Sequence, residues 1–439
     1  MEIVRSETDL LYRKIAWKLI PFLLLCYSVA IIDRFNIGFA KLQFLQELKM
    51  DNAVFGLAAG FFSVGYVASE VPSNLLLDRI GIRKTLLRIM VLWGFITFIL
   101  AFCRTEYHLY IVRFLLGAAE GGFFPGILFY LTLWFPDRLR GRMTSLFVMA
   151  VPLGGVIAGP ISGIIMDEMH ELGGLSGWQW LFMVEGLPAI ILGIVAYFYL
   201  PDRSADANWL TPHEKTIVEK DLAADRAAAV GRKASKDFSA ALRDPKVYVF
   251  AIVYFAFFCS LNTILLWSPS LLKSVGVKST TEIGFLSSLI SVLSAVGMVV
   301  VGYSSDRFLE RRWHVATCGL VASICFMLLP LVRESVFATV ALLTIASVGI
   351  FSILSLFWTI PSAYLEGSAV AGGIALISAI GSFGGAVCPA LVGWVTVATG
   401  NLYTALALVG VLHATGMILL LIATRFLARR SVAAVAALL

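Results

Sequence analysis

Long apolar runs recur along the whole chain, and they restrict its fold more than any other feature. A run of about 18 or more apolar residues is what a helix needs to cross the hydrocarbon core of a bilayer. Composition agrees, because 59% of the 439 residues are hydrophobic and only 14% are charged, against about 25% in soluble domains. The sequence therefore predicts an all-α membrane protein with twelve transmembrane helices. We place these spans at 15–40, 54–77, 85–103, 107–134, 143–166, 178–200, 247–272, 281–304, 314–332, 336–360, 369–394 and 402–425.

The basic residues predict which side of the membrane each loop faces. Of the 34 Lys and Arg, 26 lie on the side that holds both chain ends. The opposite side carries only Lys41, Lys49, Arg104, Lys273, Lys278 and Arg333. Because Lys and Arg are enriched in cytoplasmic loops, we expect the N- and C-termini in the cytoplasm. The net charge of +6 thus reflects orientation, and we see no nucleic-acid signature.

A polar stretch divides the predicted spans into two groups of six. We assign residues 1–200 to an N-terminal six-helix bundle, 201–246 to a cytoplasmic linker and 247–439 to a C-terminal six-helix bundle. In the linker, Thr211-Pro212-His213-Glu214 has the spacing of a capping box, which predicts the start of a helix. We expect this helix to be amphipathic and to lie along the membrane surface.

An internal repeat supports this division. NLLLDRIGIRKTLL follows the second span and GYSSDRFLERRWHV follows the eighth, so two Asp-Arg pairs occupy equivalent places in the two halves. Halves related by such a repeat are the architecture of the major facilitator fold. A merely basic loop would explain the basic residues but not the repeat. We therefore predict a cytoplasmic gate, closed by charge pairs between the halves, from Asp78, Arg79, Arg83, Asp306 and Arg307.

Four ionisable residues interrupt two of the spans: Asp33 and Arg34 in the first, Arg113 and Glu120 in the fourth. A charge in hydrocarbon costs roughly 2.5–3.5 kcal/mol on insertion scales, and such residues usually serve a substrate or proton pathway. Arg34 either binds an anionic substrate through its planar guanidinium or only neutralises an acid. Glu120 is either a proton carrier or a static partner of Arg113. Asp33 points about 100° away from Arg34 around the helix, so it can face span four while Arg34 faces a cavity.

Several motifs together resemble one family. DRIGIRKTLL resembles the loop signature of the major facilitator superfamily, and RFLLG at 113–117 resembles its fourth-helix arginine motif. IDRFNIGFA, EVPSNLLLDRIG, RFLLGAAEGGFFPG and GWQWLFMVEGLPA resemble the anion:cation symporter family, which includes bacterial tartrate, phthalate, hydroxyphenylacetate and sugar-acid permeases. The resemblance covers nearly the whole chain and implies a bacterial inner-membrane protein.

The resemblance also implies roles for individual residues. Asp33 and Glu120 match the family's proton-coupling acids, and Arg113 matches their partner. Arg34 matches the arginine that holds the substrate carboxylate. Further positions match or could line the substrate cavity: Tyr66, Asn262, Ser355, Trp358, Ser378 and Ser382. We expect Glu185, in the VEGLPA signature, to form a structural pair.

Two departures from the family pattern bear on the substrate. Ser378 and Ser382 stand where asparagines are common, and amides suit sugar hydroxyls. Aromatic residues such as Trp267, Trp358 and Phe383 could wall an apolar pocket. We therefore expect an acid with few hydroxyls, such as a hydroxy-acid or an aromatic acid, although serines could still serve a sugar acid.

These observations predict a monomeric, proton-coupled symporter that imports a small organic anion across the lipid bilayer by alternating access. The first alternative is a proton-coupled exporter of organic anions or drugs, since GGVIAGPISG at 154–163 resembles an antiporter motif. A membrane-embedded enzyme or sensor is a third class. The sequence shows no metal-ligand cluster, phosphate loop or nucleophile motif, and its six cysteines lack metal or disulfide spacing. We expect no cofactor and no enzymatic activity.

Overall fold

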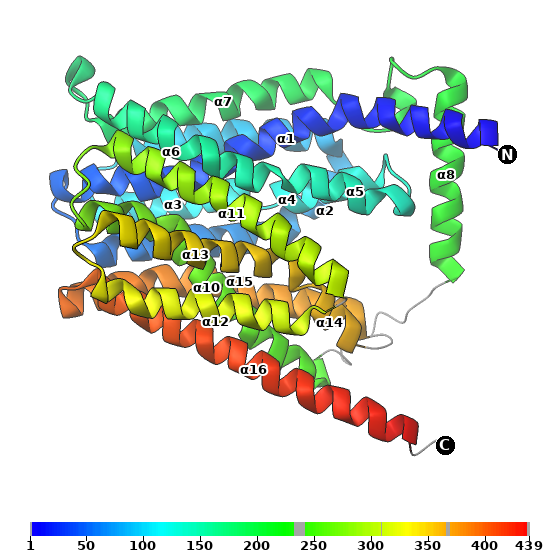
Figure 1. Cartoon of the computed structure of the whole chain (residues 1–439). Helices are drawn as coiled ribbons and strands as arrows, with labels where there is room; N and C mark the ends of the chain where they lie inside the picture. The colour runs from blue at the N-terminus through cyan, green and yellow to red at the C-terminus, as the bar shows by residue number, and fades with distance from the viewer. Residues whose placement is uncertain (1, 232–241, 309, 366–368, 437–439) are drawn as a thin grey trace.

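The computed structural model describes residues 2–231, 242–308, 310–365 and 369–436, and helices account for most of them. Figure 1 shows the long helices running side by side. They are α1 (Glu2–Glu47), α2 (Asn52–Leu100), α3 (Glu106–Glu120), α4 (Phe123–Thr132), α5 (Asp137–Val148), α6 (Ala150–Glu168), α7 (Gly177–Tyr199), α8 (Pro212–Gly231), α10 (Pro245–Ser274), α11 (Thr280–Phe308), α12 (Arg312–Leu328), α13 (Val336–Leu356), α14 (Thr359–Tyr364), α15 (Ala369–Thr399) and α16 (Leu402–Ala436). Short 3₁₀ helices lie at Leu172–Gly174, Ser204–Asp206 and Leu329–Leu331.

The spanning helices agree with the prediction. Among the described residues, 11 helical stretches are long and apolar enough to cross a membrane. The remaining predicted span, the third at 85–103, occupies the second part of α2, which turns at Gly81 (φ 81, ψ 170). A side chain there would be strained and would meet the Asp202 carboxylate, so only glycine fits this turn.

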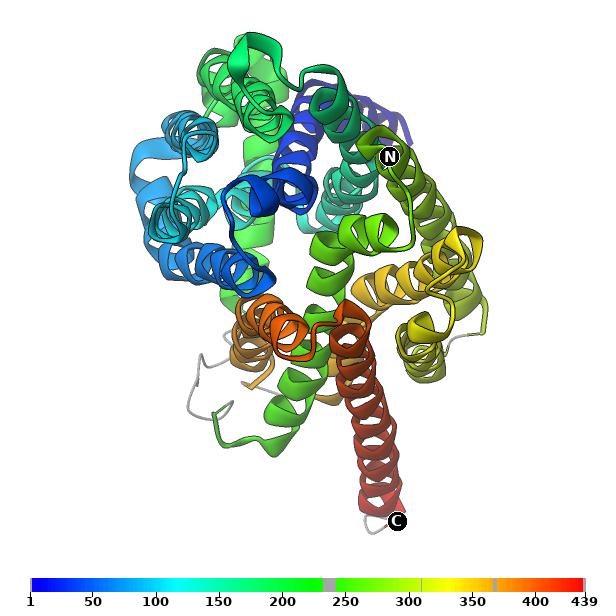
Figure 2. The same cartoon turned by 90° about the vertical axis from the view of Figure 1, so that its left-hand side faces the viewer.

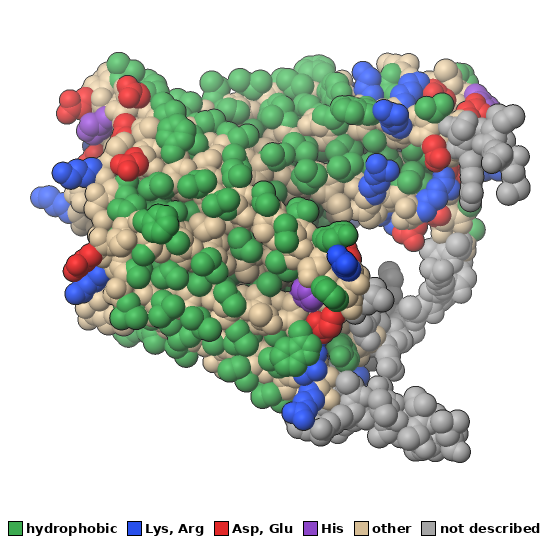
Figure 3. All heavy atoms as spheres, viewed as in Figure 1, with side chains coloured by type: hydrophobic (Ala, Val, Ile, Leu, Met, Phe, Trp, Pro, Cys, Tyr) green, Lys and Arg blue, Asp and Glu red, His purple; other side chains and the backbone are tan. Residues whose placement is uncertain are grey.

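Both chain ends and α8 lie at one end of the bundle, which we call the terminus end (Figure 1). The opposite end, which we call the loop end, carries the turns between α1 and α2 and between α6 and α7. Charged side chains gather at both ends, and hydrophobic side chains cover the belt between them (Figure 3). This distribution suits a protein that crosses a bilayer along its long axis.

Figure 2, which views the loop end, shows α1–α7 on one side of the bundle and α10–α16 on the other. We call these groups the N-half and the C-half. The predicted boundaries at residues 200 and 247 fall next to the end of α7 and the start of α10. Whether each half is a separate domain stays a prediction.

The two halves touch at the loop end through closely packed backbones. A Cβ on Gly159 would lie 2.3 Å from the Gly284 carbonyl oxygen, and one on Gly56 would lie 2.2 Å from the Pro389 carbonyl oxygen. Nearer the middle, Ser63 Oγ donates a hydrogen bond to Gly385 O at 2.9 Å. Further hydrogen bonds between the halves lie from the middle to the loop end, from Lys273 Nζ to Leu42 O, from Ser288 Oγ to Val156 O and from the Thr281 amide to Asp167 Oδ2. The space-filling view shows a hollow between the halves at the terminus end (Figure 3). The loop end is therefore closed and the terminus end is open.

The predicted capping box forms at the start of α8. The Glu214 amide donates to Thr211 Oγ1 at 3.2 Å, and the Thr211 amide donates to Glu214 Oε2 at 2.8 Å. Val218 and Leu222 are buried, which agrees with an amphipathic helix. Its polar side binds the N-half, because Lys14 Nζ lies 2.8 Å from Glu214 Oε1.

Candidate functional site

An ion pair between α1 and α3 lies at the centre of the N-half. Arg34 Nε donates to Glu120 Oε2 at 3.0 Å, and the Arg34 side chain is 31% exposed while that of Glu120 is 1% exposed. The Tyr66 ring lies 4.9 Å from the Arg34 guanidinium carbon, a cation–π distance. Arg34 therefore joins a buried acid to an accessible surface, and its remaining donors can bind an anion.

The position of Glu120 follows from a break in the fourth span, which we predicted as one continuous helix. Helix α3 ends at Glu120, and α4 begins after Gly122, whose φ is 98°. A Cβ on Gly121 would lie 2.0 Å from Ser69 Oγ, and one on Gly122 would lie 2.4 Å from Ser73 Oγ. The two glycines thus let α3 pack directly on α2 and present Glu120 at the end of its helix.

Asp33 is buried beside this pair and is held by neutral donors. Its Oδ1 accepts hydrogen bonds from Thr97 Oγ1 at 3.0 Å and from Asn36 Nδ2 at 3.1 Å. Thr97 belongs to the second part of α2, so the hydrogen bonds of Asp33 point toward span three. Asp33 also faces span four, as expected, because it interacts electrostatically with Arg113 and Glu120. The ion pair with Glu120, however, is formed by Arg34, because α3 ends where Glu120 can reach that guanidinium.

Arg113 lies behind Phe62. Its guanidinium carbon is 4.5 Å from the centre of the Phe62 ring, and the guanidinium carbon of Arg34 is 6.0 Å from the centre of the same ring. The ring thus lies close to both positive charges. Arg113 is buried and interacts electrostatically with Asp33 and Glu120, in agreement with its predicted partnership with those acids.

Three buried polar atoms of the ionisable residues in this cluster have no hydrogen-bond partner among the described residues: Asp33 Oδ2, Glu120 Oε1 and Arg113 Nε. A buried carboxylate oxygen without a donor is costly when it is charged. Protonation of either acid would remove part of that cost. The cluster is thus able to hold protons as well as an anion. It contains two acids and two arginines, so its charges cancel when all four are ionised.

The predicted residues of the C-half lie on α10, α13 and α15, and Trp358 lies between α13 and α14. Asn262 Nδ2 donates to Phe258 O at 2.9 Å, and Ser355 Oγ donates to Ser352 O at 2.9 Å. The Trp358 ring packs 4.8 Å from that of Tyr254. Ser378 and Ser382 on α15 are half-buried. Among the described residues, the structure gives Asn262, Ser355, Ser378 and Ser382 no ion pair or hydrogen bond to the Arg34 cluster.

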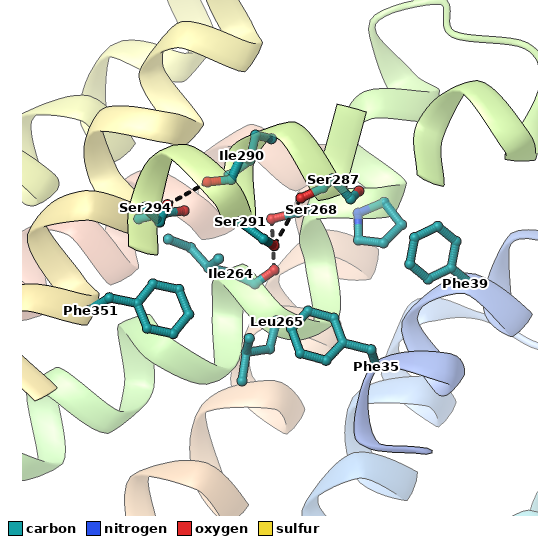
Figure 4. A pocket seen from close by; sticks show the side chains of 12 residues that line it. Phe35, Phe39, Ile264, Leu265, Ser268, Ser287, Ile290, Ser291, Ser294 and Phe351 are labelled. Atoms are coloured by element: carbon teal, nitrogen blue, oxygen red, sulfur yellow. Dashed lines mark hydrogen bonds between the residues drawn. The ribbon is translucent and has the colours of Figure 1, made fainter. Parts of the chain in front are cut away.

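A separate small pocket lies between α1, α10, α11 and α13 (Figure 4). Phe35, Phe39 and Phe351 line it together with serines of α11. Its volume of about 30 Å³ is close to the space that one water occupies in the liquid. Ser291 and Ser294 donate to carbonyl oxygens of their own helix. This pocket is too small for an organic acid in this state.

The predicted gate residues of the N-half lie at the terminus end. Arg83 donates its backbone N–H to Asp202 Oδ1 at 3.1 Å and its Nε–H to Tyr197 O at 2.7 Å. Arg79 is exposed next to the turn at Gly81. The side chain of Asp78 lies outside what the structure describes.

In the C-half, Asp306 forms an ion pair with Arg311, and Arg307 is exposed. The described ion pairs of the gate residues thus stay within one half while the terminus end is open. Charge pairing between the halves at this end stays a prediction for the opposite state.

Sequence reasoning missed several residues that complete the cluster. Asn36 stands three residues after Asp33, so helical spacing could have revealed it. Thr97 and Phe62 lie in apolar runs without a distinctive signal. Glu185 was expected to form a structural pair, and its Oε1 accepts a hydrogen bond from Ser162 Oγ at 2.8 Å.

Comparisons with known proteins agree with this architecture. The sequence matches the family model of the Major Facilitator Superfamily over residues 23–374 and 278–437. It is 43% identical over 414 residues to a putative tartrate transporter of Agrobacterium vitis, which covers 94% of this chain and 91% of the relative. It is 37% identical to a quinolone resistance transporter of Acinetobacter baumannii, with 94% of both chains covered.

One similar solved structure is a bacterial homologue of the human lysosomal transporter Spinster in an inward-facing, unoccupied conformation. The TM-score is 0.71 and the identity 17%, with 95% of this chain and 96% of that chain covered. This likeness concerns the fold alone, whereas the family model and the closer relatives establish the family. The chain is a membrane transporter, not an enzyme, and it belongs to the major facilitator superfamily.

Proposed function

We propose that the protein is a proton-coupled symporter that imports a small organic carboxylate. The observation that carries this proposal is the Arg34–Glu120 pair, in which a partly exposed guanidinium is bound to a buried acid. A guanidinium fork matches the geometry of a carboxylate. The substrate carboxylate and Glu120 therefore compete for the same donors.

Protonation decides this competition. When Glu120 takes a proton, its charge no longer holds Arg34, and an incoming carboxylate can replace it. The loaded cluster then has compensated charges, which lowers the cost of passing through a closed, dry state. Asp33 is the second proton site in this proposal, because its Oδ2 is buried without a donor among the described residues. Release of the substrate frees Arg34 to pair with Glu120 again, and the proton leaves.

The orientation of the chain completes the cycle. We infer from the basic residues that the terminus end faces the cytoplasm. The structure, closed at the loop end, then represents the inward-open state of a single chain working as a monomer. The two halves rock about the central cluster to expose it to either side.

The substrate is proposed to be a hydroxy-acid or an aromatic acid. The name of the relative in Agrobacterium vitis favours a hydroxy-acid. Serines at 378 and 382 supply hydroxyl groups where amides would bind more sugar oxygens. Trp267, in contrast, is buried at the closed loop end, so it does not wall an open cavity in this state.

The second candidate function is export of drugs or other organic anions. The relative in Acinetobacter baumannii, named as a quinolone resistance transporter, favours it. Direction of flux separates the two functions. An importer accumulates the acid when protons flow inward with it, whereas an antiporter expels its substrate as protons enter.

The test uses purified protein in liposomes with an imposed pH gradient. The wild type is expected to accumulate tartrate, phthalate or hydroxyphenylacetate on the side toward which protons flow. Glu120→Gln, which mimics a protonated acid, is expected to lose this accumulation while retaining exchange of the acid across the membrane. Accumulation by Glu120→Gln at the wild-type level would contradict the coupling role, and transport of only neutral or cationic solutes would overturn the organic-anion assignment.

A further inference from the structure

A third basic residue lies inside the closed bundle, and the proton and substrate cluster does not use it. Lys41 of α1 is only 3% exposed. Its Nζ lies 3.4 Å from the ring centre of Trp267 in the C-half and 4.1 Å from that of Phe55 in the N-half. Among the described residues this nitrogen has no hydrogen-bond partner. The ammonium is therefore placed between two aromatic rings at the junction of the halves.

This position leaves the ammonium poorly solvated. Ring faces attract a cation, but they replace only part of the hydration that a buried ion loses. Lys41 would gain from any arrangement in which its nitrogen meets water or an anion. Separation of the halves at the loop end provides such an arrangement, because Trp267 would move away with α10 while Lys41 stays with α1.

An open pocket lies over Lys41 at the loop end. Its volume is about 560 Å³, and Lys49 and Lys273 line it together with Lys41. Three of the six Lys and Arg that the sequence places on this side of the membrane therefore line one pocket. Asp51 also lines it, but its Oδ1 is engaged by the Val54 amide at the start of α2.

Two further observations show that the pocket belongs to the moving junction. Lys273 Nζ of the C-half donates to the Leu42 carbonyl oxygen of the N-half at 2.7 Å. Ser270, in the lining, has a buried hydroxyl without a partner among the described residues. Opening of the loop end would release Lys273 from Leu42 and bring unsatisfied polar groups into contact with solvent.

We propose that Lys41 and Lys273 form a second anion site, which captures the substrate carboxylate when the loop end opens and passes it to Arg34. The site rests on the proposed function, because its ligand is the same organic carboxylate. In the closed state the Trp267 ring contacts the Lys41 ammonium, and the Leu42 carbonyl oxygen accepts a hydrogen bond from the Lys273 ammonium. These contacts take the place of the ligand. The same residues thus hold the loop end shut and, once apart, attract the anion.

The test compares uptake from the two sides of the full-length protein in liposomes, with tartrate as the probe. Labelling of one end of the protein shows which side of the membrane that end faces. Lys41→Met removes the charge and keeps a long side chain. We expect it to raise the half-saturating concentration at the loop end at least about tenfold, while that at the terminus end changes less than threefold. Lys41→Arg is expected to stay near the wild type. Lys278→Met serves as the control, because Lys278 is exposed on the same side and does not line the pocket.

Salt provides a second measurement. Capture by lysines predicts that raising the ionic strength weakens loop-end uptake by the wild type more than uptake by Lys41→Met. Unchanged half-saturation in Lys41→Met, or an equal change at both ends, would overturn the inference alone. If Lys41→Met fails to fold, Lys41→Gln carries the same expectation. A wild type that transports no organic carboxylate would overturn the proposed function, and the capture site with it.

Discussion

At the scale of single residues, Arg34 makes several kinds of contact at once. Its guanidinium pairs with the Glu120 carboxylate, lies over the Tyr66 ring and is partly exposed. Lysine would keep the charge but lose the planar fork of donors. We predict that Arg34→Lys weakens binding of the carboxylate at least tenfold, or about 1.4 kcal/mol, and that Arg34→Ala weakens it further. Ligand-induced shifts in unfolding temperature measure this loss, since bound ligand stabilises the folded state by mass action.

Arg104→Lys is the matched control for this prediction. Arg104 is exposed at the loop end, and its replacement should leave the ligand-induced shift unchanged. Wild-type shifts in both Arg34 variants would mean that Arg34 is only a counter-ion for Glu120.

The sequence identified the ionisable members of this cluster but not their pairing. Charged residues in apolar runs are conspicuous, so Asp33, Arg34, Arg113 and Glu120 were all found. The pairing of each acid with an arginine depends on side-chain rotamers and on the helix break after Glu120. Neither can be predicted from the spacing of the residues along the chain. Neutral partners such as Thr97 were missed because a threonine in an apolar helix is commonplace.

At the scale of elements, the break between α3 and α4 determines where Glu120 lies. Gly122 has a left-handed φ of 98°, and a Cβ there would meet Ser73. We predict that Gly122→Ala destabilises the protein by about 1–2 kcal/mol from the backbone alone, with more from the contact. It should also weaken carboxylate binding, since it displaces the end of α3.

Gly141→Ala on α5 provides the comparison. No atom lies within 4 Å of a Cβ at Gly141, and alanine favours a helix by roughly 0.5–1 kcal/mol over glycine. This variant should unfold at the wild-type temperature or slightly above it. Equal unfolding temperatures for both variants would argue against strain at the break.

Docking of α8 on the N-half should depend on pH. Partial burial acts to raise the pKa of Glu214, but hydrogen bonds from Lys14 and Thr211 outweigh it and hold that pKa below its ordinary value of 4.5. A carboxyl with a lowered pKa stabilises the folded arrangement at pH above the ordinary value, and this contribution is lost as the pH falls through the lowered one. We predict that α8 stays docked near pH 7 and loosens below about pH 4.5.

Spin labels at exposed positions 220 on α8 and 142 on α5 would report this movement as a longer distance in acid. Glu214→Gln lacks the titrating carboxyl group, so the distance between its two labels should stay the same as the pH falls through about 4.5. A wild-type distance that stays constant down to pH 3 would contradict the assigned role of Glu214.

Spanning elements were predictable because a long apolar run has few alternatives to a helix in hydrocarbon. The start of α8 was predictable because Thr211 and Glu214 have the spacing of a capping box. Breaks inside spans were only partly predictable. The fifth span divides at Met149, between α5 and α6; Pro152, three residues later, allows a bend but does not determine the residue at which α5 ends.

At the scale of the whole molecule, glycine contacts define the closed loop end. A Cβ on Gly284 would lie 2.2 Å from the Gly159 carbonyl oxygen, so even a methyl group prevents this approach. We predict that Gly284→Ala shifts the protein toward a state in which the loop end is separated. Spin labels at exposed positions 49 and 278 would measure the change as a longer distance across the loop end.

Gly302→Ala lies on the same helix, α11, and meets no atom within 4 Å. It should give the wild-type distance distribution. An unchanged distribution in Gly284→Ala as well would show that the halves can close without this backbone contact.

The sequence could not reveal which end of the molecule is closed. The repeat around Asp78-Arg79 and Asp306-Arg307 predicted two halves, and the basic loops predicted an orientation. One sequence must nevertheless support both the inward-open and the outward-open states, which differ by only a few kcal/mol. The choice between them rests on contacts such as Gly159–Gly284, which become visible only in three dimensions.

The ion pair between Arg34 and Glu120 has a thermodynamic consequence: binding of the anion and binding of the proton are linked. If a proton on Glu120 tightens binding of the anion by some factor, the anion must tighten binding of that proton by the same factor, because the two equilibria form a closed cycle. Adding substrate to the protein in a weakly buffered solution should therefore draw protons out of that solution. An inhibitor that binds Arg34 without displacing Glu120 would leave the pH of the solution unchanged, so a pH electrode alone could tell a transported acid from a blocker.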